Sequence, residues 1–121
     1  MSDTIFTKII NREIPADIVY EDDTALAFKD IIPQAPVHLL VIPKKAIATI
    51  NDIEEGDREL VGHLYWVAGK LAKEMGFAED GYRTVMNCGE NAGQTVFHIH
   101  LHLLAGKPFG WPPYTDRAKQ A

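Results

Sequence analysis

The sequence contains a single cysteine and no long apolar run. Cys88 is the only cysteine among 121 residues, so no disulfide can form within the chain and a reducing compartment is expected. No apolar stretch approaches the ~18 residues of a membrane span, and the first residues lack the basic segment that opens a secretory signal peptide. The sequence therefore predicts a cytoplasmic protein without membrane association.

Basic residues are also scarce. The chain has 12 Lys and Arg against 17 Asp and Glu, a formal net charge of -5, and its basic residues are scattered along the sequence. A domain that grips nucleic acid through its phosphates usually shows a basic face, so no nucleic-acid partner is expected. A single small nucleotide is compatible with this composition, because backbone N–H groups and neutral side chains can hold one or two phosphates.

Length and composition are typical of one soluble domain spanning residues 1–121. The hydrophobic content is 46 %, which is enough for one core, and no linker, repeat or low-complexity segment divides the chain. Residues 106–121 contain Pro108, Pro112 and Pro113, which indicates an irregular C-terminal tail.

The spacing of apolar residues predicts an α+β fold. Residues 4–12 form a short amphipathic helix that Asp3 can cap. Residues 54–75 carry apolar side chains three and four positions apart, and Gly76 ends this long helix. The predicted strands are 18–20, 25–29, 37–43, 82–87 and 96–104. The expected fold is a five-stranded antiparallel meander with one long helix and a short N-terminal helix.

Such a sheet leaves surface exposed. One long helix covers only part of one sheet face, and the outer strands keep unpaired edges. Exposed edges and apolar surface are liabilities that a second chain removes, so we expect a homodimer.

Three of the five histidines lie close together in the sequence. In a strand the side chains alternate between the two faces, so His98, His100 and His102 share one face and the aliphatic residues between them share the other. Successive histidines would lie roughly 6.5–7 Å apart at Cα. Three histidines in strict alternation, just after a glycine-bearing turn at 88–94, differ from ordinary polar positions on a solvent-exposed strand face.

Two kinds of chemistry suit this cluster. Two histidines two residues apart on a strand can reach one zinc ion, with His38 as a third ligand, although the chain lacks the CxxC pairs of structural zinc sites. The other is nucleophilic catalysis at phosphorus, because imidazole with its pKa of ~6.5 is largely neutral near pH 7. It can attack phosphorus, carry the group as a phosphoramidate and release it to water. Neighbouring histidines can fix its tautomer, donate to phosphoryl oxygens and protonate the leaving group.

The histidine segment resembles the signature of a known family. Residues 98–104, His-Ile-His-Leu-His-Leu-Leu, match the histidine triad signature His-φ-His-φ-His-φ-φ, in which φ is apolar. Residues 30–44, 93–97 and 110–113 are similar to the Hint branch of this family. His102 separates the chain from the related uridylyltransferases, which carry Gln there. The Trp-Pro-Pro of the tail separates it from the diadenosine-polyphosphate hydrolases. The resemblance covers nearly the whole chain and implies a histidine-triad-like fold and a homodimer.

The resemblance also implies an activity. Members of this branch are purine nucleoside phosphoramidases, which hydrolyse the P–N bond of AMP joined to an amine and act on aminoacyl adenylates without a cofactor. The resemblance makes His100 the nucleophile and places His102 against the phosphate and the leaving group. His98 and His38 would hold the imidazoles in their working tautomers. A dinucleoside polyphosphate hydrolase and a nucleotide-binding regulatory module are the alternatives.

The remaining roles concern substrate binding. The resemblance assigns Asn87, Thr95 and backbone groups of Gly93 and Gln94 to the phosphate, Asp30 to the ribose hydroxyls, and Phe28 and Ile31 to the base. Taken alone, Asp30 is as well explained by capping the loop before Pro33, and Asn87 by a turn at a strand end. Thr95 stands where many Hint proteins have Ser, which keeps the hydroxyl and adds a methyl group. None of these residues is Lys or Arg, which favours a monophosphate.

Overall fold

The two helices match the two expected from the apolar pattern, with shifted ends. The computed structural model describes residues 3–114, so residues 115–121 of the predicted tail lie outside it. α1 (Ile5–Ile10) follows Thr4, whose hydroxyl accepts hydrogen bonds from the N–H groups of Phe6 and Thr7 at 3.2 and 3.3 Å. Thr4, and not the expected Asp3, is therefore the N-cap.

The long helix starts later than expected. α2 (Arg58–Met75) is preceded by a short 3₁₀ helix at Glu55–Asp57, so the first predicted turn is not α-helical. The helix ends where Gly76 adopts a φ of +88°, a left-handed conformation that favours glycine. Among residues 3–114 neither helix is long and apolar enough to cross a membrane.

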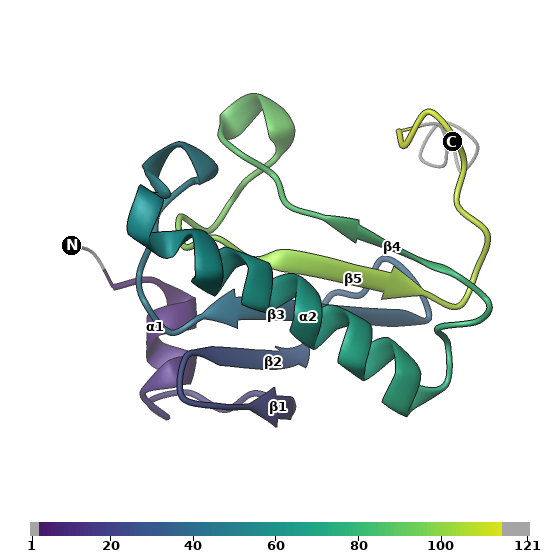
Figure 1. Cartoon of the computed structure of the whole chain (residues 1–121), viewed down its shortest axis with the longest axis horizontal. Helices are drawn as coiled ribbons and strands as arrows, with labels where there is room; N and C mark the ends of the chain where they lie inside the picture. The colour runs from purple at the N-terminus through teal and green to yellow at the C-terminus, as the bar shows by residue number, and fades with distance from the viewer. Residues whose placement is uncertain (1–2, 115–121) are drawn as a thin grey trace.

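Five strands form one antiparallel sheet (Figure 1). They are β1 (Ile18–Glu21), β2 (Ala25–Lys29), β3 (Val37–Pro43), β4 (Tyr82–Val85) and β5 (Leu101–Ala105). The expected α+β class and the number of strands are confirmed. The order is β1-β2-β3-β5-β4, which is not that of a meander. β4 forms the outer edge because the chain leaves β3 through α2, and β5 then returns between β3 and β4.

The two sheet faces carry different residues because side chains alternate along each strand. α2 lies across one face (Figure 1), where Leu64, Val67 and Leu71 pack with Leu39 and Leu101 in the larger core cluster. The opposite face packs against α1 and carries the smaller cluster, made of Phe6, Ile9, Leu26, Phe28, Leu40 and Ile42. The strand register also places His38 and His102 on this second face.

The last strand is shorter than expected. It begins at Leu101, so His98 and His100 precede it. The ladder between β3 and β5 stops at the pair Val41 and Leu101. Beyond it, the N–H of Ile99 donates to the carbonyl of Ile47 at 2.8 Å, so this backbone is tied to a loop. The prediction of one strand over 96–104 was therefore wrong for its first half.

Candidate active site

His38 and His102 lie on neighbouring strands and bond to each other. Nε2 of His38 is 2.8 Å from Nδ1 of His102, and the backbone N–H of Gln34 donates to Nδ1 of His38 at 3.0 Å. Because Nδ1 of neutral His38 accepts that bond, the proton of this ring is on Nε2 and is donated to Nδ1 of His102. His102 must then carry its own proton on Nε2.

His100 has the opposite tautomer. Its Nδ1 lies 2.8 Å from the backbone carbonyl oxygen of His98, which can only accept a hydrogen bond. The proton of His100 is therefore on Nδ1, and Nε2 keeps its lone pair. Among residues 3–114 no group bonds to that nitrogen. A neutral imidazole with a free, oriented lone pair is suited to nucleophilic attack.

His98 supports His100 through its backbone. Its own ring is only 1 % exposed, and its Nε2–H donates to the carbonyl oxygen of Pro43 at 2.7 Å. Nδ1 of His98 is buried and has no hydrogen-bond partner within residues 3–114. The bond to Pro43 fixes the segment from which His98 presents its carbonyl to His100. All three histidines of the signature are thus in one cluster, although only His102 lies in a strand.

The fold keeps these imidazoles neutral. Burial lowers the pKa of His38, His98 and His100, while the Asp30 carboxylate partly opposes this effect on His38 and His100. Burial, together with the neighbouring His100 and His38, lowers the pKa of His102 to about 4. Desolvation disfavours the charged form of a histidine. These side chains are therefore not the solvated polar positions of an ordinary exposed strand face.

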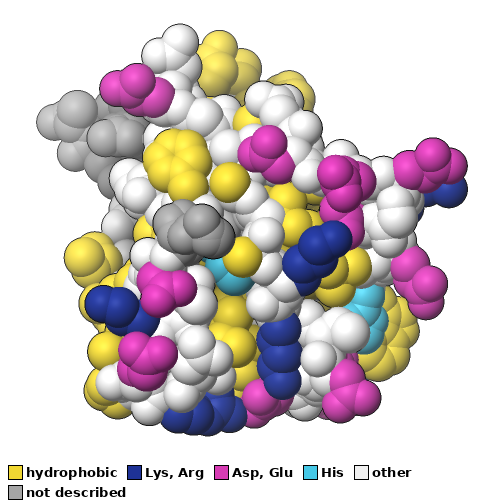
Figure 2. Space-filling view, turned by 90° about the vertical axis from the view of Figure 1, so that its left-hand side faces the viewer, with side chains coloured by type: hydrophobic (Ala, Val, Ile, Leu, Met, Phe, Trp, Pro, Cys, Tyr) yellow, Lys and Arg dark blue, Asp and Glu magenta, His cyan; other side chains and the backbone are white. Residues whose placement is uncertain are grey.

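A cavity of about 260 Å³ opens beside His100 and His102. In Figure 2 histidine atoms are visible near the middle of one face of the molecule, bordered by hydrophobic side chains. The structure brings four of the predicted binding residues to this cavity, namely Phe28, Asp30, Ile31 and Thr95. Phe28 is buried and Ile31 is 87 % exposed. The hydroxyl of Thr95 has no hydrogen-bond partner within residues 3–114, so it is available to a ligand.

Asp30 caps the loop before Pro33, as its position suggested, through one carboxylate oxygen. Its second carboxylate oxygen faces the histidine cluster. One oxygen, Oδ1, accepts the N–H of Ile32 at 2.9 Å, which is an Asx turn. The other, Oδ2, lies 3.4 Å from Nε2 of His38.

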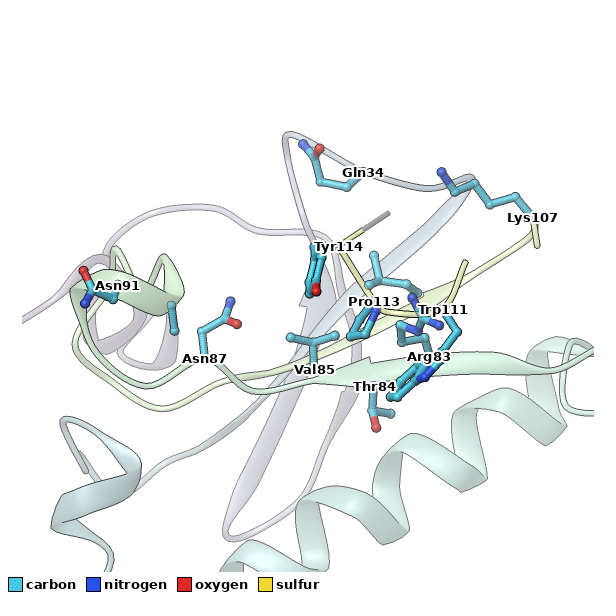
Figure 3. Close-up of a pocket in the computed structure, with 12 residues that line it drawn as sticks. Gln34, Arg83, Thr84, Val85, Asn87, Asn91, Lys107, Trp111, Pro113 and Tyr114 are labelled. Carbon is cyan, nitrogen blue, oxygen red and sulfur yellow. The ribbon is translucent and has the colours of Figure 1, made fainter. Parts of the chain in front are cut away.

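Three other predicted residues do not line this cavity. Asn87 lies instead on a larger one of about 720 Å³, together with residues of β4 and the tail (Figure 3). The N–H groups of Gly93 and Gln94 donate to the carbonyls of Glu90 and Gly89 at 3.0 and 3.1 Å. The amide side chain of Gln94 is also internally bonded, to Gly89, Ala48 and Val96. Gly93 and Gln94 therefore shape the turn before Thr95.

Most of the apolar cavity wall was not anticipated as part of the site. It comes from α1 and the segment after it, through Ile5, Phe6, Ile9, Ile14, Pro15 and Ala16, and from Leu40 and Val96. The amphipathic pattern of residues 4–12 predicted the helix but not the surface it covers. Lys29, a basic residue that was not among the predicted binding residues, also lines the cavity. Its ammonium group lies 3.4 Å from the carboxylate of Asp17.

Asp30, His38 and His102 offer the one geometric arrangement for a metal ion among residues 3–114, with candidate ligand atoms within 4.8 Å of one another. A ligating imidazole nitrogen must present a lone pair. Here Nε2 of His38 carries a proton and Nδ1 of His102 accepts it. Hydrogen bonding alone accounts for the close approach of these groups.

The cavity is thus lined by two imidazoles, His100 and His102, and Nε2 of His100 has no hydrogen-bond partner within residues 3–114. The HIT domain family model matches residues 11–109, and the chain belongs to this family and is an enzyme of it. Over 108 residues it is 54 % identical to the purine nucleoside phosphoramidase of Escherichia coli strain K12, covering 89 % of this chain and 91 % of that protein.

Other relatives agree with this assignment. An uncharacterized HIT-like protein of Synechocystis is 57 % identical over 111 residues, covering 92 % of this chain and 96 % of that protein. The crystal structure of a HIT family hydrolase from Legionella pneumophila superposes with a TM-score of 0.89 at 54 % identity. The superposition covers 92 % of this chain and 99 % of the other. The resemblance read from the histidine signature is therefore confirmed.

Proposed function

We propose that this enzyme hydrolyses the P–N bond of purine nucleoside phosphoramidates, such as AMP joined to an amine, and also cleaves aminoacyl adenylates. The observation that carries the proposal is the tautomer of His100, whose Nδ1–H is held by the carbonyl of His98 at 2.8 Å while Nε2 remains free beside the cavity. The 54 % identity to a purine nucleoside phosphoramidase supports the substrate class.

The reaction proceeds in two displacements. Nε2 of His100 attacks phosphorus and forms a P–N bond, while the bond from phosphorus to the amine breaks. The amine nitrogen keeps the electron pair and takes a proton from solvent. The nucleotidyl-imidazolium retains its Nδ1–H, which the carbonyl of His98 stabilises. Water then attacks phosphorus, the electron pair returns to Nε2, and AMP leaves with the proton of the water going to solvent. His102 donates its Nε2–H to a phosphoryl oxygen in both steps.

The cavity supports a nucleoside monophosphate as ligand. Its apolar wall, with Phe28 and Ile31, accepts a base, and Oδ2 of Asp30, which does not take part in the Asx turn, accepts ribose hydroxyls. The hydroxyl of Thr95 donates to the phosphate near His100. Lys29 is the one cation among the described lining residues, and it is paired with Asp17. Several phosphate charges would be poorly compensated here.

The proposal is tested by trapping the intermediate. With an AMP-linked amine, rapid quench and mass spectrometry should detect one added AMP on the peptide that contains His100. His100→Ala should abolish AMP release and leave nucleotide binding largely intact, whereas His63→Gln, on α2, should behave like the wild type. Exhaustive chelation should leave turnover unchanged, because no ion is needed to make this nucleophile. An adduct on another residue, or turnover that zinc restores after chelation, would contradict the mechanism.

We also propose that the enzyme acts as a homodimer in the cytoplasm, on a small nucleotide and not on nucleic acid. In the part of the chain that the structure describes, residues 3–114, β4 has a strand partner on one side only. The large cavity beside it is lined by Arg83, Lys107, Trp111 and Tyr114 (Figure 3), and Trp111 is 82 % exposed. Covering an open edge and an exposed Trp favours association. Acidic and basic side chains are interspersed over the face in Figure 2, which does not suit a polyanion.

A further inference from the structure

The loop between β2 and β3 places one backbone amide against the histidine cluster. Of the four residues Pro33-Gln34-Ala35-Pro36, two are prolines and have no N–H to donate. The N–H of Gln34 reaches Nδ1 of His38 at 3.0 Å. No role was assigned to Gln34 from the sequence, and its side chain is exposed.

The same loop is held together by its own hydrogen bonds. The N–H of Asp30 donates to the carbonyl of His38 at 2.9 Å, and the N–H of Ile32 donates to Oδ1 of Asp30 at 2.9 Å. The side-chain amide of Gln34 donates to the carbonyl of Ile32 at 3.2 Å. These bonds fix the direction in which the Gln34 N–H points. The loop therefore holds this N–H in place for its hydrogen bond to His38.

A backbone amide can only donate, and this decides where the protons of two imidazoles lie. Nδ1 of His38 must accept, so Nε2 of His38 carries the proton and donates to His102. The Asp30 oxygen 3.4 Å from that nitrogen agrees, since a carboxylate favours an N–H and not a lone pair. Every lone pair of the His38–His102 pair is then occupied by a donor. The pair has no free nitrogen to take up a proton.

We propose that Gln34 is a positioning residue whose backbone N–H sets the tautomers of His38 and His102, so that His102 presents a neutral Nε2–H to the phosphoryl group. The inference rests on the proposed function for its substrate. No proton passes along the hydrogen bonds from Gln34 through His38 to His102. If His102 lost its Nε2–H, one of the two imidazoles would be left as an anion. His102 therefore acts as an oriented hydrogen-bond donor, and charge that develops on the phosphoryl oxygens is stabilised without reorganisation.

The first experiment reads the tautomers directly. In ¹⁵N-histidine-labelled wild-type protein at pH 7, long-range ¹⁵N–¹H correlation spectra should show a protonated Nε2 for His38 and His102. His100 should show a protonated Nδ1. A protonated Nδ1 on His38 would overturn the inference, while the trapped adduct on His100 would still stand. The two proposals can therefore fail separately.

The second experiment removes the donor alone. Incorporating the α-hydroxy acid analogue of glutamine at position 34 replaces the N–H with an ester oxygen and keeps the side chain. We expect kcat to fall on the order of tenfold, as for loss of one buried hydrogen bond, with little change in KM. The ¹⁵N shifts of His38 should move toward a mixture of tautomers. The same ester replacement at Ala35, whose N–H makes no hydrogen bond within residues 3–114, is the matched control and should retain both kcat and the wild-type shifts. Unchanged His38 shifts in the ester variant would refute the role of this amide.

Discussion

Thr95 is the only hydroxyl-bearing side chain among the described residues that line the cavity with His100. Its Oγ1 has no partner within residues 3–114, so a bound phosphoryl group is its natural acceptor. Thr95→Val keeps the shape and removes the donor, and we expect kcat/KM to fall on the order of tenfold. Thr95→Ser, which keeps the hydroxyl, should stay within about twofold of the wild type. Steady-state kinetics with one AMP-linked amine distinguishes the two variants. A loss of kcat/KM in Thr95→Ser with none in Thr95→Val would show that the methyl group matters instead of the hydroxyl.

The buried histidines make the fold sensitive to acid. Burial lowers the pKa of His102 to about 4 and lowers those of His38, His98 and His100, whereas in the unfolded chain each returns to ~6.5. Between these values the unfolded chain binds protons that the folded protein does not. The free energy of unfolding should therefore decrease as pH falls from about 6.5 toward 4.

Urea unfolding at a series of pH values measures this dependence. His102→Gln removes the group with the largest resolved shift among the four, so its curve should be shallower over the same window. Above about pH 7 the wild type should show little dependence from these groups, because both states are then neutral. A wild-type stability that is constant between pH 7 and 4 would contradict the buried, neutral cluster.

At the scale of elements, α1 links the fold to the site. The ring of Phe6 makes edge-on contacts with Phe28, His98 and His100, with centroids 5.5, 6.0 and 5.0 Å apart. Phe6→Ala should lower the free energy of unfolding by about 3–5 kcal/mol and should also lower kcat, because the His100 ring loses its neighbour. The exposed Lys8, on the same helix, provides the control, and Lys8→Ala should change stability by less than about 0.5 kcal/mol. If Phe6→Ala is as stable as Lys8→Ala, α1 does not hold the site.

The elements were predictable to the extent that local pattern determines them. The stripe of α2, the stop at Gly76 and the aliphatic run of β3 each follow from residues near in sequence. The position of β5 between β3 and β4 depends on pairing between segments that are distant in the sequence. The spacing of apolar residues within one segment does not predict such pairing. The first half of the expected last strand failed for a related reason: the N–H of Ile99 bonds to Ile47, a loop partner that no pattern within 96–104 reveals.

The candidate site likewise has features that the sequence predicted and features that it could not predict. Alternation predicted that His98, His100 and His102 would gather, and His38 joined them through the β3–β5 register. The tautomers depend on two backbone groups, the carbonyl of His98 and the N–H of Gln34. Backbone groups are identical at almost every position, so residue types cannot single them out. The cavity wall from α1 is likewise a product of packing across the sheet face.

At the scale of the whole molecule, the tail follows β5, which carries His102, directly. Between β5 and Tyr114 the described tail is irregular, as expected, and Arg83 donates to the carbonyl of Gly110 at 2.8 Å. In a two-fold dimer each tail can approach the cavity of its partner. Ending the chain before Trp111 should therefore leave most of the folding intact and change the preference between a small and a bulky amine.

The measurement is the ratio of kcat/KM for the two amines, with and without the tail. Sedimentation of both proteins reports the mass, and urea unfolding confirms that the shortened chain is folded. Trp111→Ala in the full chain is a milder variant that should move the ratio in the same direction. If the wild type is a monomer, or if the kcat/KM ratio of the two amines is the same with and without the tail, the tail does not contribute to selectivity for the leaving-group amine.

The placement of His38 and His102 has a consequence for how the protein opens. They stand on β3 and β5, which are hydrogen-bonded neighbours with a strand on either outer side. Fluctuations that free such inner strands approach global unfolding in cost, whereas loop segments open far more cheaply. Thr95, Ile31 and the residues after α1 lie on such segments around the cavity. The segments around the cavity can thus open locally while the paired rings of His38 and His102 stay in place on the inner strands.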